Sequence, residues 1–272
     1  LQERPDWVLV YGDTNSTLAG ALAAVKLHIP VAHVEAGLRS FNRAMPEEHN
    51  RVLTDHAADL LFCPTPNAVE LLAREGVTSG VHLTGDVMYD AYLYNAQLAE
   101  QRADILSKLN LAPKTYALAT VHRPSNTDDP DRLRGILDAL DSLNTSVILP
   151  AHPRTRQAME KIAYRPGGNL RIIDPVGYLD MLMLEQHATH IFTDSGGVQK
   201  EAYFAGVPCV TLREDTEWTE TLEAGWNILV GAEPARILDA ARNFHPPAEQ
   251  SPLYGDGHAS EQIAALLQAQ AR

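Results

Sequence analysis

The sequence is short of positive charge. Of its 272 residues, 22 are Lys or Arg and 35 are Asp or Glu, so the formal net charge at pH 7 is −13. It contains no basic patch and no basic tail, which nucleic-acid-binding proteins use to neutralise phosphates. The composition therefore excludes nucleic acid as a partner. An acidic chain can still bind a small anion through helix N-termini and a few well-placed Arg or His side chains.

Cysteines and long apolar segments are also scarce. The two cysteines, Cys63 and Cys209, each lie in an apolar run, which predicts buried, reduced thiols rather than disulfides. No apolar run approaches the ~18–20 residues of a membrane span, and the first ten residues do not resemble a signal peptide. We therefore expect a cytoplasmic protein that does not enter a membrane. The sequence also lacks a P-loop, a G-x-G-x-x-G motif and metal-ligand spacing.

Short apolar runs alternate with helical patterns. Continuous runs of Val, Ile and Leu between helices are typical of parallel sheets covered on both faces. The predicted fold class is therefore α/β, with doubly wound sheets. The expected strands span residues 7–11, 30–34, 60–63, 81–84, 116–121, 147–150, 170–173, 190–193, 208–212 and 227–230. The expected helices between them span residues 16–27, 47–56, 66–75, 130–142, 178–187 and 197–205.

The alternation is interrupted once, over residues 86–113, where a polar helical segment contains no strand candidate. This predicts two Rossmann-like domains: residues 1–110, which include the linker, and residues 111–258, which bind a nucleotide. A helix over residues 259–272 is expected to pack back on the first domain. The first domain has fewer strand candidates than the second, and a βαβ unit takes roughly 30 residues. We therefore expect the first domain to be incomplete, and the binding and any activity of the chain alone to be weak or absent.

Carboxylates follow two strands of the first half. Asp13 follows the first strand and Glu35 ends the second, and ligands of doubly wound sheets bind at the carboxyl ends of strands. Glu47 opens a helix shortly afterwards. Three carboxylates at one sheet edge suit paired acid and base roles. Two structural interpretations stay open, with Asp13 as a helix N-cap and Glu47 as a complement to the helix dipole.

A glycine turn precedes a helix in the second half. Ser195–Gly197 follow a strand, and bare backbone N–H groups at a helix N-terminus bind anions. Glu201, about two turns further on, is a candidate acceptor for ribose hydroxyls. His122 and Arg123 close another strand and are candidates to face a diphosphate. An ordinary capped helix and a structural histidine are the alternatives.

Seven motifs occur in a specific order and spacing: GDTNST, HVEAGLRS, MPEEHNRVLTDH, GDVMYDA, TVHR, TDSGGVQKEA and LREDTEW. Together they resemble the non-hydrolysing UDP-N-acetylglucosamine 2-epimerase family, over essentially the whole chain. The resemblance implies a GT-B fold, with UDP-sugar in the cleft between two Rossmann-like domains. It also implies interconversion of UDP-N-acetylglucosamine and UDP-N-acetylmannosamine, for cell-surface polysaccharide synthesis, without a metal or redox cofactor.

The resemblance implies a role for each candidate residue. The C2 proton is removed while UDP leaves C1, which gives 2-acetamidoglucal, and UDP then adds back with a proton on the other face. Asp13, Glu35 and Glu47 are the implied acid/base groups, and His122 lies at the diphosphate. The complete predicted substrate-binding set is Arg123, Ser195, Gly196, Gly197, Glu201 and Arg213. Relatives in the family are dimers, which implies a homodimer.

Two positions depart from the common family motifs. Ser125 replaces a Glu, and Trp218 replaces an Arg that can contact the nucleotide. Members with the TEW sequence include enzymes for other UDP-2-acetamido sugars, so the substituents at C3, C4 and C6 stay open. Three other functions stay open too: a hydrolysing 2-epimerase, a GT-B glycosyltransferase and a non-enzymatic nucleotide-binding fragment.

Overall fold

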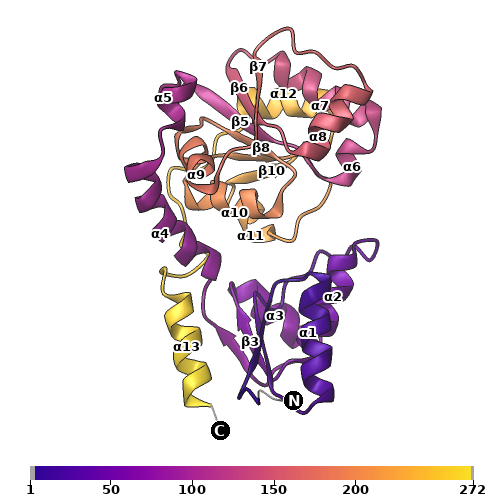
Figure 1. The fold of residues 1–272 in the computed structure, drawn as a ribbon, viewed down its shortest axis with the longest axis vertical. Helices are drawn as coiled ribbons and strands as arrows, with labels where there is room; N and C mark the ends of the chain where they lie inside the picture. Colours follow the sequence, from indigo (N-terminus) through magenta and orange to yellow (C-terminus); the bar gives the residue numbers. More distant parts are fainter. Residues whose placement is uncertain (1–3, 271–272) are drawn as a thin grey trace. The chain divides into compact units, whose positions relative to one another are not determined.

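The computed structural model describes residues 4–270, which form two compact units (Figure 1). Unit 1 runs to Leu93 and resumes at Pro252, and unit 2 spans Tyr94–Ser251. The division falls inside the expected linker. Residues 252–258, which the sequence analysis assigned to the second domain, belong instead to unit 1. The reason is local, because the buried Tyr254 accepts a 3.0 Å hydrogen bond on its carbonyl oxygen from the backbone N–H of Asp86.

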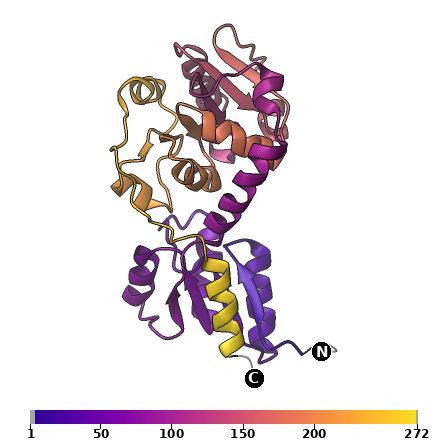
Figure 2. The ribbon, with the colours of Figure 1, turned by 90° about the vertical axis from the view of Figure 1, so that its left-hand side faces the viewer.

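Unit 1 is a parallel four-stranded sheet with helices on both faces. Its strands, which pair in chain order, are β1 (Val8–Tyr11), β2 (Val31–Val34), β3 (Leu60–Cys63) and β4 (Val81–Leu83). Its helices are α1 (Asn15–Lys26), α2 (Pro46–Ala57), α3 (Pro66–Arg74) and α13 (Ala259–Ala269). Successive strand side chains point to opposite faces. Ala32 and Val34 therefore pack against Ile263 of α13, which lies over the strands in Figure 2, while Val31 packs against Ala21 of α1.

Unit 2 is a parallel six-stranded sheet with the strand order β10-β9-β8-β5-β6-β7. Its strands are β5 (Tyr116–Thr120), β6 (Ser146–Pro150), β7 (Leu170–Ile173), β8 (Ile191–Thr193), β9 (Cys209–Thr211) and β10 (Asn227–Leu229). Its helices are α5 (Ile105–Leu109), α6 (Pro124–Thr127), α7 (Pro130–Asp141), α8 (Pro153–Lys161), α9 (Tyr178–His187), α10 (Gly196–Phe204), α11 (Thr219–Glu223) and α12 (Pro234–Asn243). Helix α4 (Val87–Arg102) begins in unit 1 and ends in unit 2. Ala117 and Leu118, adjacent on β5, belong to the cores on opposite faces.

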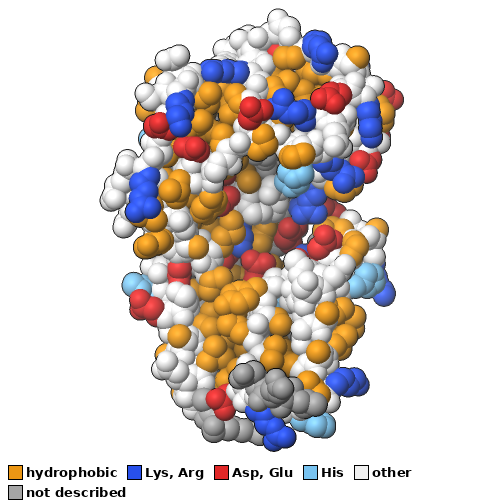
Figure 3. All heavy atoms as spheres, viewed as in Figure 1, with side chains coloured by type: hydrophobic (Ala, Val, Ile, Leu, Met, Phe, Trp, Pro, Cys, Tyr) orange, Lys and Arg blue, Asp and Glu red, His pale blue; other side chains and the backbone are white. Residues whose placement is uncertain are grey.

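All ten expected strands are present, with ends that differ from the expected ones by at most one residue. Helices α8 and α12, and the short helices α6 and α11, were not expected. Helix α8 is mostly polar in sequence, and only Thr155, Ala158 and Met159 on it are buried. Within residues 4–270, no helix is long and apolar enough to cross a membrane. Figure 3 shows Lys and Arg side chains scattered among Asp and Glu on the face in view, rather than gathered in a patch.

Truncating Ile263 should destabilise unit 1. Its side chain is 5% exposed and joins α13 to β2 and β3, so Ile263→Ala leaves a cavity that costs about 2–5 kcal/mol. The neighbouring exposed Gln262 gives the matched control, Gln262→Ala. Urea unfolding should show a lower free energy of unfolding for Ile263→Ala alone. Equal stability of the two variants would mean that α13 does not contribute to the core of unit 1.

Candidate active site

The turn after β1 presents Asp13. Gly12 has a φ of +60°, a left-handed conformation that glycine adopts without steric cost. Thr14, and not Asp13, is the N-cap of α1, so the N-cap interpretation of Asp13 was wrong. The Asp13 carboxylate instead accepts a hydrogen bond from Nη2 of the buried Arg51, and Nδ2 of Asn50 donates to its backbone carbonyl at 2.9 Å. Helix α2 therefore holds this turn in place.

Glu35 lies beside the same turn. It follows β2 directly and has a φ of +69°, an uncommon conformation for a residue with a side chain, which costs about 1–3 kcal/mol. Its Oε1 atom lies 3.6 Å from the position that a Cβ atom on Gly12 would take. Because Gly12 directly precedes Asp13, the strained residue Glu35 and Asp13 belong to one cluster.

Adjacent glutamates at the start of α2 have different surroundings. Glu48 is buried, and its carboxylate accepts 2.9 Å hydrogen bonds from the backbone N–H groups of Ser40 and Phe41. Glu48 thus fixes the loop that precedes α2. Glu47 is half-buried in the first turn of α2, one turn before Asn50 and Arg51. In this position Glu47 can interact favourably with the positive end of the helix dipole and can also take part in chemistry.

In unit 2, the fully buried Asp194 fixes the end of β5. Its carboxylate accepts hydrogen bonds from the backbone N–H groups of His122 (3.0 Å) and Arg123 (2.9 Å) and from Nδ2 of Asn126 (3.0 Å). The His122 ring lies with its Nδ1 3.4 Å from Asp194 and its centroid 5.7 Å from that of His152. Burial lowers the pKa of His122 and outweighs the opposing effect of Asp194, so the ring is mainly neutral at pH 7.

The N-terminus of α10 lies next to a buried arginine. Ser195 is the N-cap, and its Oγ accepts from the Val198 backbone N–H at 3.4 Å. A Cβ atom on Gly196 would lie 2.4 Å from Oε1 of Glu217, so this carboxylate can pack there only against glycine. Arg213 donates to Glu217 at 3.0 Å through Nη2, and Nη1 has no hydrogen-bond partner within the described residues. Burial opposes the charge of Arg213, but Glu217 and Asp215 outweigh it and raise the pKa.

Trp218, one of the two departures from the family motifs, packs under α10. Its side chain is buried, and Nζ of the buried Lys200 lies 4.1 Å from the ring centroid. A cation over an indole ring is attracted by the ring quadrupole, and desolvation strengthens this interaction. Trp218 thus interacts with the positive charge of Lys200, which belongs to the helix that Ser195 caps.

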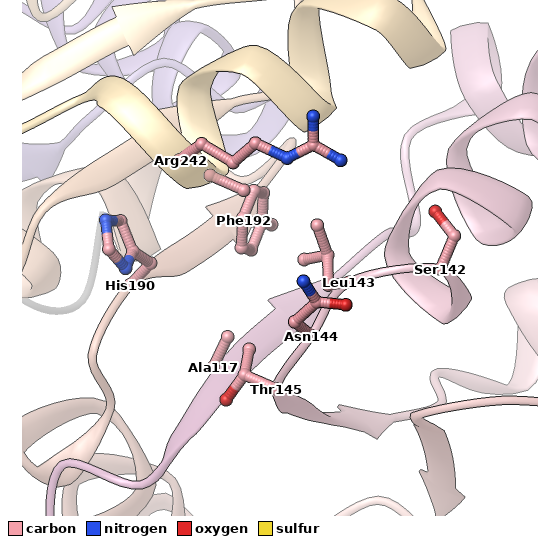
Figure 4. Close-up of a pocket in the computed structure, with 9 residues that line it drawn as sticks. Ala117, Ser142, Leu143, Asn144, Thr145, His190, Phe192 and Arg242 are labelled. Carbon is pink, nitrogen blue, oxygen red and sulfur yellow. The ribbon is translucent and has the colours of Figure 1, made fainter.

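A mainly apolar cavity of about 190 Å³ adjoins His122. Its lining residues are Thr120, Val121, His122, Pro150, His152, Pro175, Val176, Met181 and Val198. Apolar walls with a few polar groups are typical of small-molecule sites. A second cavity, of about 170 Å³, opens near the amino ends of β5, β6 and β8 and is drawn in Figure 4. It contains none of the predicted site residues.

Glu201 forms a buried acid pair with Glu185 of α9. Oε1 of Glu201 accepts a 2.9 Å hydrogen bond from the Tyr178 hydroxyl. Glu185 is fully buried, and burial, together with the charge of Glu201, raises its pKa well above the usual value. Burial also raises the pKa of Glu201. The pair therefore retains a proton at a pH where exposed carboxyls are ionised.

The similarity to known proteins identifies the family. A family model described as UDP-N-acetylglucosamine 2-epimerase matches residues 1–268. The chain belongs to this epimerase family. The predicted family is thereby confirmed, on a match that covers nearly the whole chain.

Individual epimerases match over most of their length. A Methanococcus maripaludis protein named UDP-N-acetylglucosamine 2-epimerase homolog is 53% identical over 98% of this chain and 76% of its own. The UDP-2,3-diacetamido-2,3-dideoxy-D-glucuronate 2-epimerase of Pseudomonas aeruginosa is 50% identical over the same shares. The crystal structure of Methanocaldococcus jannaschii UDP-GlcNAc 2-epimerase with UDP-GlcNAc and UDP gives a TM-score of 0.90 at 43% identity, over 98% of this chain and 77% of that one. The fold is therefore GT-B, and this epimerase is an isomerase.

The predicted site residues fall into two sets. Asp13, Glu35 and Glu47 lie in unit 1, and the other seven lie in unit 2. Sequence reasoning missed Arg51 and Asp194, which orient the first members of each set, although Asp194 directly precedes Ser195. Arg51 gave a weak signal, since it is a cation within an acidic motif. Among the described residues, no three His, Cys, Asp or Glu side chains gather as metal ligands.

Replacing Glu185 with glutamine should make the epimerase more stable at higher pH. The pKa of Glu185 is raised by folding, so its contribution to stability is fully present below the unfolded pKa and is lost as pH rises through the folded one. Glu185→Gln removes this loss. The gain in melting temperature over wild type should therefore be larger at pH 8 than at about pH 5. Glu160→Gln, at an exposed site on α8, is the control. A pH-independent difference would show that Glu185 does not titrate with folding.

Proposed function

We propose that the chain interconverts UDP-N-acetylglucosamine and UDP-N-acetylmannosamine, or a related pair of UDP-2-acetamido sugars. The observation that carries this proposal is the carboxylate cluster around the Gly12 turn, in a chain that belongs to an epimerase family. A 2-epimerase must remove and return a proton at C2 on opposite faces of the sugar, and several carboxylates at one edge suit that task.

The UDP part of the substrate is assigned to unit 2. The N-terminus of α10 offers backbone N–H groups and the positive end of the helix dipole to a diphosphate. The buried Lys200 in this helix and the buried Arg213 add positive charge. Glu201, held by Tyr178, is positioned to accept hydrogen bonds from ribose hydroxyls, and the 190 Å³ cavity next to His122 has walls suited to a flat base.

The chemistry at C2 is assigned to unit 1. A carboxylate removes the C2 proton, and the C–H electron pair forms the C1–C2 double bond while the C1–O bond breaks and its electrons leave with UDP. The products held by the enzyme are 2-acetamidoglucal and UDP. In the reverse sense UDP adds to C1 and a proton is delivered to the other face of C2. This needs two acid/base groups, which we assign among Asp13, Glu35 and Glu47.

The leaving group needs stabilisation because the C2 proton is only weakly acidic. Donors aimed at the oxygen where charge develops lower the barrier more than donors that bind substrate and transition state equally. His122 is mainly neutral, so one ring nitrogen can donate a hydrogen bond and the other can accept one. We assign His122 to hydrogen bonding with the departing diphosphate, with Arg123 beside it.

A second candidate substrate is a UDP-2,3-diacetamido-uronate. The relative named for that sugar is 50% identical to this chain, whereas the Methanocaldococcus jannaschii UDP-N-acetylglucosamine 2-epimerase is 43% identical. Offering both UDP-sugars separately, and comparing kcat/KM, distinguishes the two. Accumulation of free UDP with the sugar would indicate the hydrolysing alternative. The homodimer and the cytoplasmic location stay predictions, and light scattering tests the first.

A bulky residue at Gly197 should weaken UDP binding. Gly197 is half-buried in the first turn of α10, where a Val side chain would keep phosphate oxygens from the N–H groups. Losing one charge-assisted hydrogen bond costs about 1.5–3 kcal/mol, or about 10–100-fold in Kd. Calorimetry with UDP measures this, and Gly167→Val, where an added Cβ meets nothing within 4 Å, is the control. Unchanged UDP affinity in Gly197→Val would place the diphosphate elsewhere.

Amide substitutions of the three carboxylates should stop exchange at C2. In D2O, proton NMR of the wild-type reaction should show loss of the C2–H signal together with the appearance of the epimer. Asp13→Asn, Glu35→Gln and Glu47→Gln should each slow this by about 10²–10⁴-fold while leaving UDP affinity near that of wild type. The exposed Glu70→Gln is the control. A variant that exchanges C2 at the wild-type rate excludes its residue from the acid/base set.

A further inference from the structure

A buried histidine lies beneath the turn that carries the proposed acid/base residues. His33 on β2 is fully buried. Its Nε2 atom lies 2.7 Å from the Gly12 carbonyl oxygen, and its Nδ1 atom lies 2.7 Å from Oδ1 of Asp55. The ring therefore bridges the β1 turn and α2.

Both groups that face the ring are acceptors. A backbone carbonyl oxygen can only accept a hydrogen bond. The other oxygen of Asp55 already accepts from the backbone N–H of Gly37 (3.1 Å) and from Nη1 of Arg39 (2.7 Å). A neutral imidazole has one donor and one acceptor nitrogen, so it would place a bare nitrogen 2.7 Å from an oxygen. Both contacts are hydrogen bonds only if both ring nitrogens carry hydrogen.

The surrounding charges balance such a ring. Arg39, itself buried, pairs with Asp55 and also donates to Glu75 through Nε and Nη2, each at 2.7 Å. Two cations and two carboxylates are thus joined in one network, which buried charges require. Cys63 also lies near Asp55 and Arg39, and burial raises the pKa of its thiol to about 12, so it adds no charge. The exposed His56 of α2 lies with its Nε2 3.8 Å from Oε2 of Glu75.

We propose that His33 is a positioning residue of the epimerase, held as an imidazolium between Asp55 and the Gly12 carbonyl. Through Gly12 it fixes Asp13, the next residue. Through its own strand it fixes Glu35, two residues later, in the strained conformation at φ +69°. This inference rests on the proposed function for its effect on turnover, but not for the state of the ring.

Nitrogen NMR tests the state of the ring directly. The protein is labelled with ¹⁵N-histidine, and the His33 signals are those missing from a His33→Gln sample. We expect both His33 nitrogens to carry hydrogen at pH 7 and to show imidazolium shifts, as the two contacts to acceptors require. One nitrogen with hydrogen and one without, at pH 7, would overturn the proposal. This result does not depend on which sugar the enzyme accepts, so it is separable from failure of the proposed function.

Turnover tests the positioning role. His33→Leu and Asp55→Asn should lower kcat by about 10²-fold, the effect of small misplacement of catalytic groups, with KM and UDP affinity little changed. His33→Gln, which keeps one donor, should recover part of the loss. His258→Gln, at an exposed site in unit 1, is the control. Wild-type kcat in a folded His33→Leu variant would overturn the proposal, and if that variant does not fold, Asp55→Asn is decisive in the same way.

Discussion

In each unit, the loops at the carboxyl edge of the sheet are held in place by one buried aspartate. Where a parallel strand ends, backbone N–H groups leave the ladder and need other acceptors. Asp194 supplies them in unit 2 by accepting from the N–H groups of His122 and Arg123, and Asp55 does so in unit 1 by accepting from Gly37. Both aspartates are almost completely buried, so removal of either would leave buried N–H donors unpaired. Removal of Asp55 would also break its buried ion pair with Arg39, which costs about 3–5 kcal/mol. The buried carboxylates of Asp55 and Asp194 thus orient the side chains of the candidate site.

Some of the few positively charged side chains of this acidic chain are buried. Arg39 and Arg51 are buried in unit 1, and Lys200 and Arg213 are buried in unit 2. Each contacts a carboxylate or an aromatic ring that limits its movement. A fixed cation in a poorly solvated place acts on a bound diphosphate or a carboxylate more strongly than an exposed one. The negative net charge of the whole molecule is therefore compatible with an anionic substrate.

The strand-end rule predicted most of the fold from the sequence, and it also pointed to the residues of the candidate site. Asp13, Glu35 and His122 were identified because each follows an apolar run, and in parallel sheets those ends share one edge. The residues that hold them were not identified, because the pairing of Arg51 with Asp13 and of Asp194 with His122 joins positions far apart in the chain. Burial decides which acid is structural, as Glu48 and Glu47 show, and no local pattern separates two adjacent glutamates. Helix α8 was missed because its buried face is small and partly polar.

The central claim is that the C1–O bond breaks and UDP remains bound before it adds back. UDP-N-acetylglucosamine with ¹⁸O in the bridge between C1 and the β-phosphorus tests this claim most directly. Once the bond has broken, rotation of the β-phosphate makes its oxygens equivalent. Phosphorus NMR of the recovered substrate should therefore show the label moving into non-bridging positions as the epimer accumulates. Formation of the epimer with all of the label still in the bridge would contradict the account.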